Sequence, residues 1–255
     1  MNRFADIMKK TLHSAPPALG FRPAAAVKKP HMLLVAGLTS LEAGETWSNE
    51  GADVLLFKFE PTPTLKTLKQ AAQLASGRPW GLFVRSGGKA VEQANKAGSD
   101  FVVFEPAVMD ISILDYTDLG KVLFIGDEVE DVLLKSGSDL PFEAVIMEHT
   151  RPYISWQDLM YFRKVAAFVS KPLLLTVSQD ITEKGLQALW ASGIDGVIIY
   201  TADIAALGRI RQNIDSTIFP ERGKGAKMRL MVPMFRGEVD SPPDEREHED
   251  DEDEE

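Results

Sequence analysis

The chain contains no cysteine, which excludes disulfide bonds, thiolate metal sites and thiol nucleophiles together. It also lacks any apolar run near the roughly 18 residues that a membrane-spanning helix needs, so we expect a cytoplasmic protein without a membrane span. Signatures of zinc sites, dinucleotide-binding turns, nucleophile elbows and hydrolase triads are missing as well. Basic residues do not cluster with aromatic ones, and we therefore do not expect nucleic-acid binding.

An acidic surplus is lacking in most of the chain, although the total suggests one. The 255 residues carry 38 acidic and 28 basic side chains, a net charge of −10. Twelve of the acids and a single base lie between residues 238 and 255, which leaves 26 acidic and 27 basic residues in the other 237. We therefore predict a nearly neutral folded body followed by a disordered acidic tail over residues 238–255.

The first 30 residues have a composition of their own, with six bases and a single acid, Asp6. Apolar residues recur at helical spacing, which predicts a short amphipathic helix up to about Thr11 and then a strap that packs on the body. A basic start with few acids is also typical of an organellar transit peptide, and this alternative stays open.

Between residues 31 and 216 one pattern repeats: a short run of β-branched and large apolar residues that ends at a polar residue. These runs are continuously apolar rather than alternating, as strands buried on both faces are, which predicts a parallel sheet covered by helices. The eight runs are Met32–Leu38, Val54–Phe59, Gly81–Val84, Phe101–Phe104, Val122–Ile125, Ala144–Met147, Leu173–Val177 and Val197–Tyr200.

The segments between the runs are long enough for crossover helices, and six of them place apolar residues on one helical face. These six are Pro63–Leu74, Lys89–Ala97, Glu128–Leu134, Trp156–Phe168, Glu183–Trp190 and Ile204–Ile214. The other two, 41–49 and 111–119, fit the helical pattern less well, because the first contains Gly44 and the second is rich in β-branched residues and aspartate.

A Gly-x-Asp motif stands before three of the predicted strands, at Gly51, Gly98 and Gly193. Glycine adopts the left-handed conformation that ends a helix before the chain turns into the sheet. Eight successive strand–helix units of this kind resemble the TIM (β/α)8 barrel superfamily over residues 31–216. The resemblance implies a single α/β barrel domain with its site at the carboxyl ends of the strands. An open doubly wound sheet is the alternative.

Residues 217–237 differ from the barrel, because four bases precede an apolar stretch that ends at Phe235. Such a segment either returns across its own body or docks on a partner or a membrane surface. We therefore predict a basic-apolar C-terminal segment here that could bind a protein partner.

Polar residues follow every predicted strand, and a barrel would gather them at one rim. They are Thr39 and Ser40, Lys58 and Glu60, Arg85 and Ser86, Glu105, Asp127, Glu148 and His149, Thr176, Ser178 and Gln179, and Tyr200 and Thr201. Because alternate residues of a strand share a face, we predict that Lys58, Glu60, Arg85 and Glu105 point into the barrel mouth.

Four of these residues are predicted to be catalytic. Lys58 would act as an amine or as an anion anchor, and Glu105, Glu148 and His149 would move protons. The carboxylates Glu105, Asp127 and Glu148 could also ligate a divalent cation such as Mg²⁺. No other cofactor is indicated.

Seven residues are predicted to bind the substrate: Glu60, Arg85, Ser86, Gly87, Gly88, Asp127 and Ser178. Arg85 and the following glycine pair would hold an anion at the start of a helix. The loops after the seventh and eighth strands contain no glycine, and Asp180 and Asp203 are predicted to cap the helices there, so we do not expect the phosphate site that many barrels have at this position.

These residues predict a lyase, aldolase or isomerase that acts on a small anionic metabolite. The alternative is a non-catalytic barrel for ligand binding or assembly, whose charged residues only neutralise one another as ion pairs. Convergence of Lys58, Arg85 and Glu105 on an open pocket, with their charged groups unpaired, would favour the enzyme. Mutual pairing of these residues under a closed roof would favour the alternative.

Overall fold

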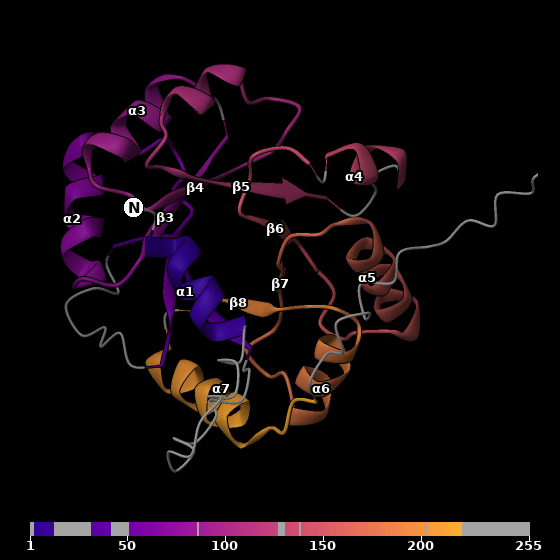
Figure 1. Ribbon diagram of the computed structural model, residues 1–255. Helices are drawn as coiled ribbons and strands as arrows, with labels where there is room; N and C mark the ends of the chain where they lie inside the picture. The colour runs from indigo at the N-terminus through magenta and orange to yellow at the C-terminus, as the bar shows by residue number, and fades with distance from the viewer. Residues whose placement is uncertain are drawn as a thin grey trace, which may run out of the picture.

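The computed structural model describes residues 3–12, 32–41, 51–85, 87–126, 131–137, 139–201 and 203–220. Eight parallel strands follow one another around a single closed barrel, and helices surround it (Figure 1). The first strand is hydrogen-bonded to both the second and the eighth. The predicted TIM-like barrel is therefore confirmed, and the open doubly wound alternative is wrong because the sheet has no edge.

Each strand falls on one of the eight predicted apolar runs. The strands are β1 (Leu33–Leu38), β2 (Val54–Phe57), β3 (Trp80–Val84), β4 (Phe101–Phe104), β5 (Gly120–Ile125), β6 (Ala144–Met147), β7 (Leu173–Thr176) and β8 (Gly196–Tyr200). The helices are α1 (Arg3–Leu12), α2 (Leu65–Ala75), α3 (Lys89–Lys96), η2 (Ile111–Asp115), α4 (Asp131–Gly137), α5 (Trp156–Phe168), α6 (Glu183–Ala191) and α7 (Ile204–Ser216). None of the helices in the described ranges is long and apolar enough to cross a membrane.

Some boundaries differ from the predicted ones. The second strand ends at Phe57 instead of Phe59, and residues 111–119 contain only the 3₁₀ turn η2, which Asp110 caps by accepting a hydrogen bond from Ser112 N. Helix α4 extends three residues beyond its predicted end. The predicted helix at 41–49, the strap, most of the basic-apolar segment and the acidic tail lie outside the described residues.

The alternation of side chains along the strands separates two apolar layers. One set packs inside the barrel, and the other packs against the surrounding helices. The inner set consists of Leu33, Val35, Val54, Leu56, Phe83, Phe101, Val103, Val122, Ala144, Ile146, Leu174 and Ile198. The interior is therefore a packed core up to the carboxyl ends of the strands.

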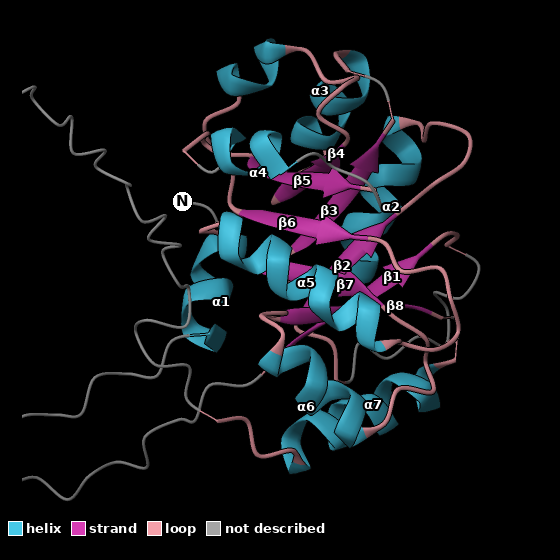
Figure 2. Cartoon of the chain, turned by 90° about the vertical axis from the view of Figure 1, so that its right-hand side faces the viewer, coloured by secondary structure: helices cyan, strands magenta, loops and turns pink. Residues whose placement is uncertain are grey.

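Helix α1 covers the amino end of the barrel, opposite the arrowheads of the strands (Figure 2). Phe4 is fully buried and stacks on Phe101, with 4.2 Å between the ring centroids. Arg3 forms two hydrogen bonds with Asp100, at 2.7 and 2.8 Å, and its pKa is raised by this bonding. Among the described residues, α1 thus closes the amino end of the barrel interior, and the carboxyl end is the one to examine for a ligand site.

The three predicted left-handed glycines are confirmed, with φ of +100° at Gly51, +79° at Gly98 and +101° at Gly193. The acid that follows two residues later accepts a hydrogen bond from a backbone N–H at the start of the preceding strand. A fourth acid, Glu143, does the same without a glycine. The four pairs are Asp53 with Leu34, Asp100 with Trp80, Glu143 with Lys121 and Asp195 with Leu173, at 2.9, 3.0, 2.5 and 2.9 Å. The same hydrogen bond therefore recurs in four successive pairs of strands, β1–β2, β3–β4, β5–β6 and β7–β8.

Candidate functional site

The candidate site continues the inner layer of side chains beyond the ends of the strands. Lys58 is two residues past the inward Leu56, and Glu148 is two residues past the inward Ile146. Tyr200 is the last residue of β8 and packs against the same inner layer. Strand geometry therefore directs these three side chains to one place from distant parts of the sequence.

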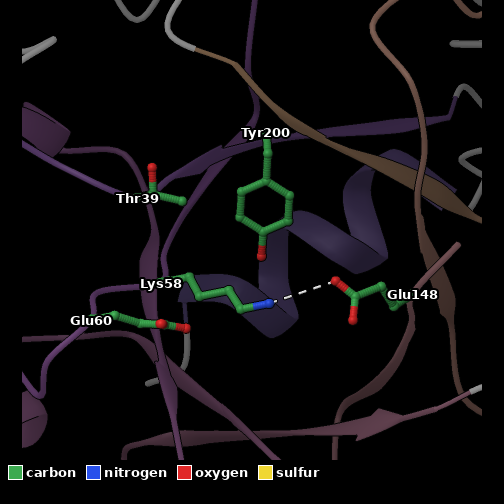
Figure 3. Close-up of a pocket in the computed structure, with 5 residues that line it drawn as sticks. All are labelled: Thr39, Lys58, Glu60, Glu148 and Tyr200. Carbon is green, nitrogen blue, oxygen red and sulfur yellow. Dashed lines mark ion pairs between the residues drawn. The ribbon is translucent and has the colours of Figure 1, made fainter. Parts of the chain in front are cut away.

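A pocket of about 490 Å³ opens at this end of the barrel. It is lined by Thr39, Lys58, Glu60, Glu148 and Tyr200, which Figure 3 shows pointing toward a common space. Lys58, Glu60 and Glu148 belong to the predicted site. Thr39 and Tyr200 were among the strand-end residues but not among the predicted site residues.

Lys58 is the basic group that lines the pocket. Its Nζ lies 3.6 Å from Glu148 Oε1 and 5.2 and 5.8 Å from the ring centroids of Phe83 and Tyr200. The nitrogen thus lies near one carboxylate and over two aromatic rings, at distances typical of cation–π contacts. The side chains of Lys58 and Glu148 are 22% and 36% exposed, so the pair is partly buried and still reaches the pocket from which a ligand would approach.

Tyr200 lies against the backbone of β1 at Gly37, its partner in the strand register. A Cβ at Gly37 would be only 2.4 to 2.8 Å from three atoms of the Tyr200 ring. Burial raises the pKa of the Tyr200 phenol, and the negative charge of Glu148 raises it further. The phenol therefore stays protonated and points its hydroxyl toward Lys58 and Glu148 (Figure 3).

The signal that could have identified Tyr200 is the glycine opposite it. A glycine inside a buried strand frequently marks a close approach of another group, and Gly37 occupies an inward position of the first strand. The glycine thus indicated that a large side chain of a neighbouring strand packs on it, and Tyr200 is that side chain.

Arg85 lies at the rim and forms an ion pair with Glu60. Both side chains are more than 60% exposed. Glu60 lines the pocket and Arg85 does not, so Arg85 reaches the site only through Glu60. Of the two, only Glu60 is among the lining residues, so a position of Arg85 in the barrel mouth stays a prediction.

None of the other predicted residues within the described ranges lines the pocket. Glu105 is exposed, and Ser178 Oγ accepts a hydrogen bond from Asp180 N at 3.3 Å. A Cβ added at Gly87 would lie 3.6 Å from both Asp110 N and Met109 Sδ, and Gly88 precedes α3 without a side-chain cap. Ser86 and Asp127 lie outside the described residues. Among the described residues no group of three or more His, Asp or Glu could hold a metal ion.

His149 lies on the other side of its strand from Glu148. Its Nε2 is 2.9 Å from the carbonyl oxygen of Tyr153, and its ring meets the Phe162 ring edge-on at 6.0 Å. The preceding outward residue, Met147, already belongs to the layer that packs on the helices. The structure therefore does not bring His149 to the pocket, and its catalytic role stays a prediction.

The loops after β7 and β8 confirm one predicted cap and correct the other. Asp203 caps α7 by accepting a hydrogen bond from Ala205 N at 2.9 Å. The cap of α6 is Thr182 instead of Asp180, and its Oγ1 accepts a hydrogen bond from Gly185 N at 3.2 Å. The helix begins two residues later than a cap at Asp180 would require.

Comparison with known proteins identifies the fold. The sequence matches no protein-family model and no curated protein. A mutant tryptophan synthase alpha-subunit from Pyrococcus furiosus is 13% identical with a TM-score of 0.54, over 72% of this chain and 98% of that chain. Thiamine phosphate pyrophosphorylase from the same organism is 16% identical with a TM-score of 0.58, over 73% and 97%. A protein from Aquifex aeolicus VF5 is 14% identical with a TM-score of 0.58, over 86% and 100%. At such identities the likeness shows that this chain has the TIM-barrel fold, which it shares with enzymes of different reactions.

Proposed function

We propose that the protein is a lyase that binds a small carbonyl compound as an imine on Lys58. The observation that carries the proposal is the position of the Lys58 ammonium in an open pocket, 3.6 Å from Glu148 and beside the protonated phenol of Tyr200. An amine, a carboxylate that can take its proton, and a neutral hydrogen-bond donor are the groups that imine formation needs.

The proton balance follows from these groups. Glu148 accepts a proton from the Lys58 ammonium, and the neutral amine adds to the carbonyl carbon to give a carbinolamine. Glu148 then returns the proton to the carbinolamine hydroxyl, which leaves as water and gives the iminium ion. Tyr200 donates a hydrogen bond to the carbonyl oxygen during the addition.

The iminium ion makes the next bond easier to break. The bond between the α-carbon, which is attached to the iminium carbon, and the hydroxyl-bearing β-carbon breaks. Its electron pair forms the C=C bond of an enamine, and the π pair of the C=N bond moves onto nitrogen. Glu148 accepts the proton of the hydroxyl on the departing carbon, which leaves as a second carbonyl compound. Protonation of the enamine and addition of water then release the first product and restore Lys58.

The non-catalytic alternative also has an observation in its favour. Lys58 and Arg85 are each paired with a carboxylate, as expected if the charges only neutralise one another. The pocket above them is nevertheless open, and the Lys58 pair is the longer of the two. Of Lys58, Arg85 and Glu105, only Lys58 lines the pocket, and it is paired, so the criterion for the enzyme is not fully met. The closed roof of the alternative is not met either, and an experiment on Lys58 separates the two functions.

The test is borohydride reduction in the presence of small aldehydes, ketones and oxo acids, followed by peptide mass spectrometry. We expect a reduced adduct on Lys58, with much less on the exposed Lys66 and Lys69, which serve as references in the same sample. Glu148→Gln keeps the shape of the side chain and should slow the adduct by about a hundredfold or more. Adducts that are no faster on Lys58 than on the reference lysines would refute the proposal.

A further inference from the structure

The carboxyl rim of the barrel offers different groups on its two sides. The side formed by the loops after β7 and β8 is where many barrels bind phosphate through free backbone N–H groups. The side formed by β2 and β3 carries the Arg85–Glu60 pair. The groups on each side determine which anionic substituent a substrate could have.

Side chains of the chain itself already accept from four backbone N–H groups of the β7 and β8 loops and of the helix starts that follow them. Asp203 and Thr182 accept from the first turns of α7 and α6. Thr201 Oγ1 accepts from Asp203 N at 3.0 Å, and Ser178 Oγ accepts from Asp180 N at 3.3 Å. A phosphate at this position would have to displace these acceptors.

The charge on this side also opposes a phosphate. Asp180 and Asp203 are exposed carboxylates in the two loops. Arg209 is 3.8 Å from Asp203 and compensates one of these charges. A phosphate ester carries about −1.5 to −2 charges at neutral pH, so its binding here would add to an uncompensated negative charge.

The β2–β3 side already holds a single carboxylate. Arg85 is paired with Glu60, which also lines the pocket, and both side chains are largely exposed. A substrate carboxylate could replace Glu60 on the guanidinium with no change in net charge, because one carboxylate is exchanged for another. The exposure of both side chains makes this exchange inexpensive.

From these observations we infer that the substrate is an unphosphorylated oxo acid, with its carbonyl carbon at Lys58 and its carboxylate at Arg85. This inference rests on the proposed imine chemistry and names the substrate class of the same pocket. It specifies the predicted anionic metabolite as a carboxylate and not a phosphate ester.

The experiment compares adduct formation on Lys58 for pyruvate, dihydroxyacetone and dihydroxyacetone phosphate under borohydride. Each rate is divided by the rate on Lys66 in the same sample, which removes the intrinsic reactivity of each carbonyl compound. We expect the ratio for pyruvate to exceed both others by at least about tenfold. In Arg85→Gln the pyruvate ratio should fall by about tenfold, and the dihydroxyacetone ratio should not change.

Asp203→Asn is the matched variant on the opposite side. Asparagine retains the oxygen that caps α7 and removes the charge, so the ratio for dihydroxyacetone phosphate should rise while that for pyruvate stays the same.

The outcomes separate this inference from the proposal beneath it. Preferential adducts with dihydroxyacetone phosphate, or pyruvate adducts that do not respond to Arg85→Gln, would overturn the oxo-acid substrate and leave the imine chemistry standing. Absence of a preferred Lys58 adduct with all three compounds would overturn both.

Discussion

Replacement of Gly37 by alanine should displace the Tyr200 ring without adding or removing any polar group. The added methyl group would be 2.4, 2.5 and 2.8 Å from three ring atoms, well inside van der Waals contact. Overpacking of this kind costs about 1–3 kcal/mol. In a domain of this size, each kcal/mol lowers the melting temperature by about 2–4 °C, so we expect a fall of about 2–12 °C.

A second glycine provides the control for the backbone effect of this change. Gly208 lies in α7, and a Cβ there would have no heavy atom within 4 Å. Gly208→Ala should therefore stabilise the protein by about 0.4–1 kcal/mol, because alanine restricts the unfolded chain. Differential scanning calorimetry on both variants measures the two opposite shifts.

The double variant Gly37→Ala/Tyr200→Ala tests the cause. If the ring is what the methyl group meets, the penalty of the glycine replacement should largely disappear once the ring is gone, and the two changes should not be additive. An undiminished penalty in the Tyr200→Ala background, or a Gly37→Ala protein as stable as the parent, would refute the packing argument.

Three further changes test the amino end, the repeated unit and the acid stability. Phe4→Ala should lower the free energy of unfolding by about 3–5 kcal/mol, because its ring is fully buried on Phe101. Trp156 is 83% exposed, so Trp156→Ala should change this free energy by less than about 0.5 kcal/mol. Equal effects of the two replacements in urea titrations would refute the role of α1. Asp195→Ala should lower the free energy of unfolding by about 1–3 kcal/mol and accelerate hydrogen exchange at the Leu173 amide. Asp195→Asn keeps an acceptor and should lower it less. Identical exchange in both variants would contradict the role of Asp195 as the acceptor for this amide. Burial alone would raise the pKa of Asp158, but hydrogen bonds from Ser155 and the positive charges of His149 and Arg151 lower it. The ionised carboxylate therefore stabilises the folded protein above the ordinary aspartate pKa, and this stabilisation is lost as the pH falls through the lowered pKa. Asp158→Asn should therefore reduce the difference in melting temperature between pH 7 and pH 3, and the exposed Asp180→Asn should not; equal pH dependence in parent and Asp158→Asn would contradict this.

The fold was predictable because its signals are local and repeat eight times. A strand buried on both faces, such as Phe101–Phe104, must be continuously apolar, and a left-handed residue such as Gly98 must be glycine or pay a steric penalty. Closure of the barrel was predictable only through the number of units, because no residue in the sequence reports that β1 and β8 are neighbours.

The candidate site was predictable to the extent that strand parity fixes direction. Parity correctly placed Lys58 and Glu60 toward the mouth, and the same rule, applied to Met147, would have directed His149 outward. The cap of α6 could not be read in this way, because Asp180 and Thr182 are both good capping residues and the start of the helix decides between them. The sequence also could not show which charged groups at the rim form ion pairs, because this depends on their distances in the folded protein.

The two ion pairs at the rim agree with the proposed chemistry once their positions are considered. A pair that only neutralised charge would gain most from a short contact sealed from water, but the Lys58–Glu148 contact is 3.6 Å long and borders the pocket, and the Arg85–Glu60 pair is exposed. Each carboxylate can instead have a role when a ligand binds. Glu148 would accept the proton of the Lys58 ammonium, and Glu60 would leave the Arg85 guanidinium so that a ligand carboxylate takes its place. Glu60→Gln therefore offers a discriminating change, because it frees Arg85 without altering Lys58. Pyruvate should then form its Lys58 adduct at a lower concentration, whereas a rim that serves only charge balance would lose stability and gain no affinity for the oxo acid.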